Sequence, residues 1–175
     1  MKKISILLLI TVFHNISLKA QHEKDWIPSK ETTLEMIYWL RDNPLGPSDS
    51  LFIEKNKEII KWKSNRSTRY GNYIVRGIQE ITNDVNYPYS REIQTTYIHG
   101  HIVYEIEPNK RRNYEINSCY FSILFVIEYY KNLLLKDEDL KNNLLENYIN
   151  LEQQGKLKEH IKQLLEKPVE VAPWY

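Results

Sequence analysis

The sequence has little cysteine, little net charge and, after its first twenty residues, no long apolar run. A single cysteine, Cys119, excludes an internal disulfide, so the core must be stable without one. Lys and Arg total 24 against 23 Asp and Glu. This balance argues against a nucleic-acid-binding protein, which normally has a clear basic excess. No later segment approaches the ~18 uncharged apolar residues of a membrane span, so none is expected.

Several common catalytic motifs are also missing. The sequence contains no phosphate-binding loop, no G-x-S-x-G nucleophile elbow and no H-E-x-x-H pair of zinc-binding histidines. Cys119 lies in the apolar segment NSCYFSILFVIEYY, where no local base would activate a thiolate, and is interpreted as a small buried hydrophobe. These absences favour a protein without catalytic activity and without a cofactor, although they do not exclude an unfamiliar enzyme.

The first twenty residues have the pattern of a secretory signal peptide. Two lysines precede the apolar run Ile4–Phe13, and a short polar stretch then ends at Ala20. Cleavage near Ala20 would leave residues 21–175 with 21 basic and 23 acidic residues, a net charge of −2. That length suits a single domain with a sizeable core. We therefore expect residues 1–20 to be removed and the remainder to be periplasmic or secreted.

The rest of the chain has the apolar spacing of amphipathic helices. Apolar side chains recur at steps of three and four residues over several segments, and Pro or Gly follows most of them. The predicted helices are a short one ending before Asn43-Pro44 and others over about 50–65, 90–107, 109–136, 137–155 and 156–168. The last two should form a hairpin through Gly155. The sequence thus predicts an all-α domain, a compact bundle of five or six helices.

Two segments leave a minor β-segment open. Residues 73–81 are rich in β-branched side chains and are interrupted by Gly77. Residues 97–107 alternate between apolar and polar positions, as a strand would. The full run from Ser90 is long for a strand and ordinary for a helix, which favours the helix. On a helix, Gly100 would let a neighbouring helix pack closely.

The motif that most resembles a catalytic site is His99-Gly100-His101. On a strand both imidazoles would face the same side and could bind a metal ion together with Glu105, with Glu107 as the general base. This alternative predicts a metal-dependent hydrolase. On a helix the two side chains point ~200° apart and cannot chelate one ion. His101 would then lie at a helix interface and His99 in solvent.

Glu128 is the carboxyl group most worth testing for burial, because it interrupts the apolar run FSILFVIEYYKNLLL. If it were buried, its pKa would be raised and it could act as an acid. The more ordinary interpretation places it on the narrow polar side of its helix or in a pair with Lys or Arg.

A basic and aromatic stretch, KWKSNRSTRY, supplies the predicted binding residues. Basic side chains interleaved with aromatics suit an anionic ligand or an acidic protein surface. The predicted contacts are Trp62, Arg66, Arg69 and Tyr70. Together with the leader and the missing catalytic motifs, this stretch indicates an exported, soluble, non-enzymatic protein that binds a macromolecular partner, such as an inhibitor or immunity-type protein. The metal-dependent hydrolase is the alternative.

Overall fold

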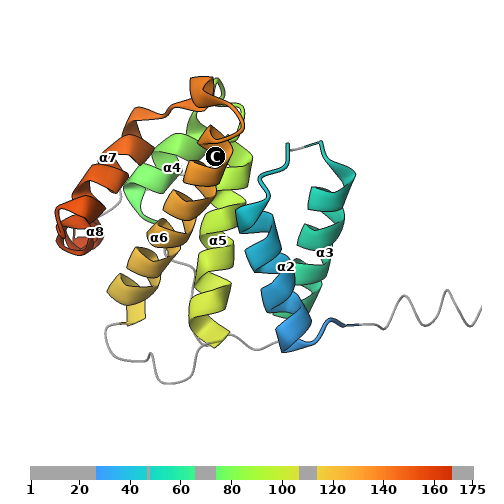
Figure 1. Ribbon diagram of the computed structural model, residues 1–175. Helices are drawn as coiled ribbons and strands as arrows, with labels where there is room; N and C mark the ends of the chain where they lie inside the picture. Colours follow the sequence, from blue (N-terminus) through green and yellow to red (C-terminus); the bar gives the residue numbers. More distant parts are fainter. Residues whose placement is uncertain (1–26, 47, 66–73, 107–113, 167–175) are drawn as a thin grey trace, which may run out of the picture.

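The computed structural model describes residues 27–46, 48–65, 74–106 and 114–166, and within these ranges it contains α-helices and no strand (Figure 1). The elements are α2 (Lys30–Asp42), α3 (Ser50–Ser64), α4 (Arg76–Asn83), α5 (Ser90–Ile106), α6 (Tyr114–Leu134), a short 3₁₀ turn η1 (Glu138–Leu140), α7 (Asn143–Gln153) and α8 (Leu157–Glu166). The predicted all-α bundle is confirmed. It has one helix more than expected, α4. The predicted signal peptide lies outside the described residues.

Side-chain caps fix several of the helix starts. The side chain of Ser29 accepts a hydrogen bond from the backbone N–H of Thr32 at 3.0 Å, which begins α2. Asp49 accepts from the N–H of Leu51 at 2.8 Å and begins α3. Each cap satisfies an N–H group that has no partner inside its helix and stabilises the end by about 1 kcal/mol. The local sequence therefore sets these boundaries before any packing occurs.

The two β-alternatives are wrong wherever the structure describes them. Residues 76–83 form α4, which buries Ile78 and Ile81 at helical spacing on one side. Gly77 does not interrupt this helix: a Cβ atom there would collide with the Tyr148 hydroxyl of α7. Its lack of a side chain therefore lets α4 and α7 approach closely.

The centre of the molecule is the pair α5 and α6. A Cβ atom on Gly100 would lie 2.7 Å from the Cα atom of Ser122, which is closer than real atoms approach. The close approach predicted for Gly100 is confirmed, and the neighbouring helix is α6. Ser122 is itself buried and donates its hydroxyl to the Ser118 carbonyl oxygen at 2.8 Å. This contact holds the two longest helices against each other.

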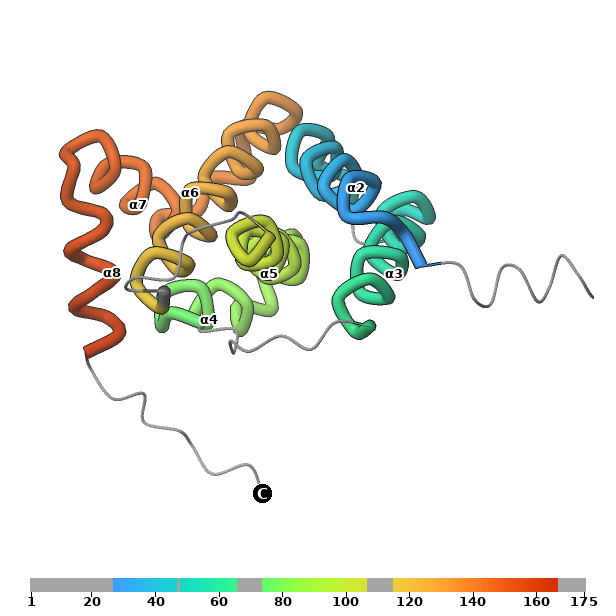
Figure 2. Tube along the Cα trace, turned by 90° about the horizontal axis from the view of Figure 1, so that it is seen from below, coloured from blue at the N-terminus to red at the C-terminus, as the bar shows by residue number. Residues whose placement is uncertain are grey.

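Two groups of helices pack on this central pair, one on each side (Figure 2). One core joins α4, α7 and α8 to α5 and α6, and it buries Tyr97, Ile123, Tyr130 and Tyr148. The second core joins α2 and α3 to the same pair. It buries Ile37, Ile59, Trp62, Ile102 and Phe125. The fold is therefore a central pair with a helical layer on either side.

The C-terminal hairpin is confirmed, but its first helix begins later than predicted. Gly155 adopts φ 66° between α7 and α8, a backbone conformation that glycine accepts without strain. Residues 138–140 form only the 3₁₀ turn, and α7 begins after Asn142, whose side chain accepts from the N–H groups of Leu144 and Leu145. A search of the described helices finds none long and apolar enough to cross a membrane.

Candidate functional site

A partly open groove lies between α3 and α5, with a volume of about 370 Å³. This size falls in the usual range for ligand pockets. Helix α3 contributes Asn56, Ile59, Ile60, Lys63 and Ser64. Helix α5 contributes Thr95, Ile98, His99 and Ile102. We call this the α3–α5 groove. Four isoleucines and five polar residues line it, and most of the surface that they present to the groove is apolar.

His99 is the polar group that its surroundings perturb most. Its side chain is 3% exposed. Burial and, to a smaller extent, the positive charge of Lys63 together lower its pKa from 6.5 to about 3. A buried imidazole avoids the charged form because the protein solvates charge less well than water does. His99 is therefore neutral at physiological pH, and so weak a base is poorly suited to general base catalysis near neutrality.

Lys63 stands at the same end of the groove. Burial lowers the pKa of its amine, and the negative charge of Glu105 offsets part of that effect. When charged, the Lys63 amine is less completely hydrated than that of a surface lysine. Such an amine attracts an anionic group more strongly than an exposed one does.

Asn56 and Thr95 supply neutral polar groups to the groove. The side-chain oxygen of Asn56 is buried and has no hydrogen-bond partner among the described residues. A buried acceptor left in this state costs about 1–3 kcal/mol, which a bound group with a suitable donor would recover. The groove can therefore bind an aliphatic group and also select for a donor beside it.

One lip of the groove remains apolar where it meets solvent. Ile53 is 55% exposed and Ile60 is 61% exposed, and the two are seven residues apart on α3. Residues at that spacing share one face of a helix. The other exposed aliphatic residues in the described part of the chain are Ile27, Leu51, Ile74, Val85 and Leu135. Single exposed hydrophobes are ordinary, whereas a pair on one helix face beside a groove makes that face a candidate contact surface.

The arrangement that the metal-dependent hydrolase requires is contradicted. Residues 97–106 are helical, so His99 and His101 point to opposite sides of α5. His101 is fully buried, with its ring 4.9 Å from that of Tyr97 in an edge-on contact. No group of three or more metal-binding side chains occurs in the part of the chain that the structure describes. Glu107 lies outside those residues.

The expectation that His99 faces solvent is also wrong. Helix α3 covers this side of α5, so the imidazole forms part of the groove wall. The expectation for His101, that it lies at a helix interface, is confirmed by its full burial within α5.

The predicted contact residues are only partly described. Trp62 is 5% exposed and belongs to the core that joins α2 and α3 to the central pair. Its indole packs in the interior and leaves little surface for a partner. Arg66, Arg69 and Tyr70 lie outside the described residues, as does the end of the basic stretch that they form.

The buried carboxyl group is Glu92, not Glu128. Glu128 is exposed and pairs with Lys131 at 2.7 Å, in agreement with its more ordinary interpretation. Glu92 is fully buried, and neither of its carboxyl oxygens has a hydrogen-bond partner among the described residues. Glu92 falls on one row of α5 with Thr96 and Val103, which are also buried.

Burial raises the pKa of Glu92, and its own backbone N–H and the charge of Arg91 offset only part of that rise. The hydroxyl of Tyr129 on α6 is likewise buried without a partner among the described residues. Burial raises the pKa of Tyr129, and the charge of Glu92 adds to the rise. Neither Glu92 nor Tyr129 is among the lining residues of the two described cavities, and both lie in the interior, so we expect them to affect stability.

A second, more polar hollow of about 450 Å³ lies between α4 and the start of α7. Glu80, Asp84, Tyr87 and Lys141 are among its lining residues. The side chain of Asp84 already makes a local hydrogen bond, which it accepts from the backbone N–H of Asn86 at 2.9 Å. The mixed charges and open shape make this hollow a weaker candidate than the α3–α5 groove.

Comparison of the chain with protein-family models, curated proteins and solved structures gives no match. The candidate function therefore depends on the residues and geometry of the α3–α5 groove.

Proposed function

We propose that this is an exported, non-enzymatic protein that binds a protein partner through the α3–α5 groove. The carrying observation is the pair Ile53 and Ile60, more than half exposed on one face of α3 beside an apolar pocket. Contact with a partner would remove this aliphatic surface from water, at about 25 cal/mol for each Å² buried. The leader pattern in residues 1–20 supports export.

The polar groups of the groove support binding in preference to catalysis. His99 is too weak a base near neutral pH, and the positive charge of Lys63 interacts with the negative charge of Glu105. Acid–base catalysis normally needs a group whose pKa lies near the working pH. A binding surface needs only aliphatic anchors and a few oriented polar groups, and the groove offers both.

Site-specific cross-linking tests this proposal. A photo-reactive amino acid would replace Ile60 in the full chain, expressed in the cells that make the protein, with Leu135 as the matched control position. Leu135 is 86% exposed and stands just after α6. We expect one discrete protein adduct from position 60 and none of that mass from position 135. Equal adducts from both positions, or none from position 60, would show that the groove is not the contact surface.

A substitution provides the second readout. Ile60→Asp places a charge on an exposed lip, so the fold should survive, as a thermal melt would check. The same variant should lose binding of the cross-linked partner at least tenfold, because a charge in an apolar contact must be desolvated. Leu135→Asp should bind as the wild type does.

A further inference from the structure

We propose that the group bound in the α3–α5 groove is an amphipathic α-helix of the partner, with acidic residues along its flanks. This inference rests on the function proposed above and names the kind of segment that the groove accepts. Three observations support it: the helical walls, the aliphatic lining and the charges around the groove.

The walls of the groove restrict how a partner segment can bind. Both are helices, so the backbone N–H and C=O groups of residues 56–60 and 95–102 are bonded within α3 and α5. A partner strand would therefore find no free edge to pair with, which excludes β-strand addition. Recognition of a polyproline segment uses grooves lined by Trp, Tyr or Phe, and none of the described lining residues is one of these. A helix laid in the groove is the mode that remains.

The position of α2 shows that a helix can pack against both α3 and α5 at their observed separation. α2 contacts both α3 and α5, and Ile37 and Leu40 of α2 are buried with Ile59 and Ile102 in one core. The views from the side and from below place α2 beside both helices (Figures 1 and 2). α3 and α5 therefore stand at a separation that accepts a helix against both. A partner helix would use apolar residues at i, i+3 or i+4, and i+7, to meet the isoleucines.

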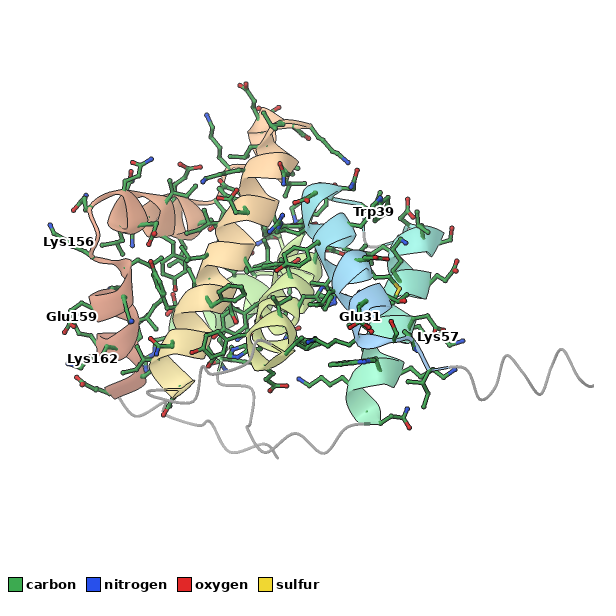
Figure 3. The ribbon with its side chains drawn as sticks, turned by 60° about the horizontal axis from the view of Figure 1, so that its bottom comes forward. Glu31, Trp39, Lys57, Lys156, Glu159 and Lys162 are labelled. Atoms are coloured by element: carbon green, nitrogen blue, oxygen red, sulfur yellow. The ribbon has the colours of Figure 1, made fainter. Side chains whose placement is uncertain are left out.

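The charges around the groove favour an acidic helix. Lys57 stands between Ile53 and Ile60 on α3 and projects from the outer side of that helix (Figure 3). Arg91 is exposed one turn before Thr95 on α5. Glu105 opposes the charge of Lys63, and along α3 the four lysines at 55, 57, 61 and 63 outnumber the two glutamates at 54 and 58. Complementary charge would speed association and reject a basic partner, with an effect that salt weakens.

The buried oxygen of Asn56 adds a specificity element. It accepts no hydrogen bond from the described residues and lines the groove beside Ile59 and Ile60. If the Asn56 amide turns toward the groove, a donor on the partner helix, such as a Gln, Asn or Ser side chain, would satisfy this oxygen. A helix with only aliphatic residues at that point would leave the acceptor unsatisfied and bind less tightly.

Peptide selection tests the inference directly. A display library of random 16-residue peptides would be selected on the full-length wild-type protein and depleted on the Ile60→Asp variant. The result that we expect is enrichment of sequences with apolar residues at helical spacing, net negative charge and no internal proline. Enrichment of extended, proline-rich or basic sequences would overturn the inference, and so would the absence of any enriched sequence. Decanoate, tested separately, probes whether a small aliphatic acid occupies the groove instead.

Variants then locate the contact. A selected peptide should bind the double variant Lys57→Glu, Arg91→Glu at least tenfold more weakly at low salt, while Leu135→Asp should leave binding unchanged. Nuclear magnetic resonance shifts should move at Ile98 and Ile102.

Binding of decanoate alone, with no helical peptide, would assign the groove to a small ligand. With the photo-reactive residue moved to position 53, if Ile60→Asp abolishes cross-linking of the natural partner while no helical peptide binds, the proposed function stands and the helix is wrong. If it leaves cross-linking intact, the groove itself is wrong.

Discussion

Acid should destabilise this protein through His99. The pKa of His99 is lowered from 6.5 to about 3 in the folded protein by burial and by Lys63. An unfolded chain returns the imidazole to water and to its ordinary pKa. Below pH 6.5 the unfolded state therefore binds a proton that the folded state does not, and stability must fall as the pH falls.

The size of this effect follows from the pKa difference. Each pH unit between the two pKa values contributes about 1.4 kcal/mol to the free energy of unfolding. The loss begins near pH 6.5 and continues to about pH 3. Between pH 7 and pH 5, His99 should lower the free energy of unfolding by about 2 kcal/mol. That is a large share of the 5–15 kcal/mol typical of a domain.

Urea denaturation at pH 7 and pH 5 measures this pH-dependent loss of stability. We compare the wild type with His99→Gln, which keeps a polar side chain of similar size but cannot titrate. His160→Gln is the matched control, because His160 lies on α8 beside Tyr148, far from the groove. The pH-dependent loss should shrink by about 2 kcal/mol in His99→Gln only. Equal losses in the wild type and His99→Gln would refute the argument that His99 is buried and neutral.

The remaining predictions concern the buried carboxyl group of Glu92 and the packing of Gly100 and Trp62. Glu92→Gln should stabilise the protein by on the order of 1 kcal/mol at pH 8. The same substitution should have little effect near pH 4. Burial raises the pKa of Glu92, so the stability of the wild type falls as the pH rises above 4.5. Equal effects of Glu92→Gln in urea denaturation at both pH values would contradict this prediction. Gly100→Ala should cost about 1–3 kcal/mol, since its Cβ would meet Ser122, and an unchanged melting temperature would disprove the close contact. Trp62→Ala should cost about 3–5 kcal/mol by calorimetry, and a loss below about 1 kcal/mol would show that the indole is not in the core.

The helices themselves were largely predictable because their signals are local. The α3 helix begins at Ser50 and ends at Ser64, within one residue of the predicted 50–65. Its start depends on a nearby cap, and its face on apolar residues at steps of three and four, which adjacent residues determine. The α4 helix remained ambiguous because it is short, and a β-branched run of eight residues suits either structure.

The candidate site could not be predicted to the same degree, as His99 and Trp62 show. His99 was expected in solvent, yet α3 covers it and makes it part of a groove wall. Trp62 was chosen as a contact residue because it is aromatic and flanked by basic residues, and the packing of α2 and α3 places it inside. Both outcomes depend on which neighbouring helix lies over a given face.

The sequence by itself determined the fold class, most helix boundaries, the close packing at Gly100 and the hairpin at Gly155. Each follows from residues near one another in the chain, through capping, periodicity and backbone freedom. Only the tertiary structure decided that Glu92 is buried and Glu128 exposed, and that α3 and α5 enclose a groove. Periodicity gives the faces of a helix, but burial depends on contacts between segments that the sequence separates by tens of residues.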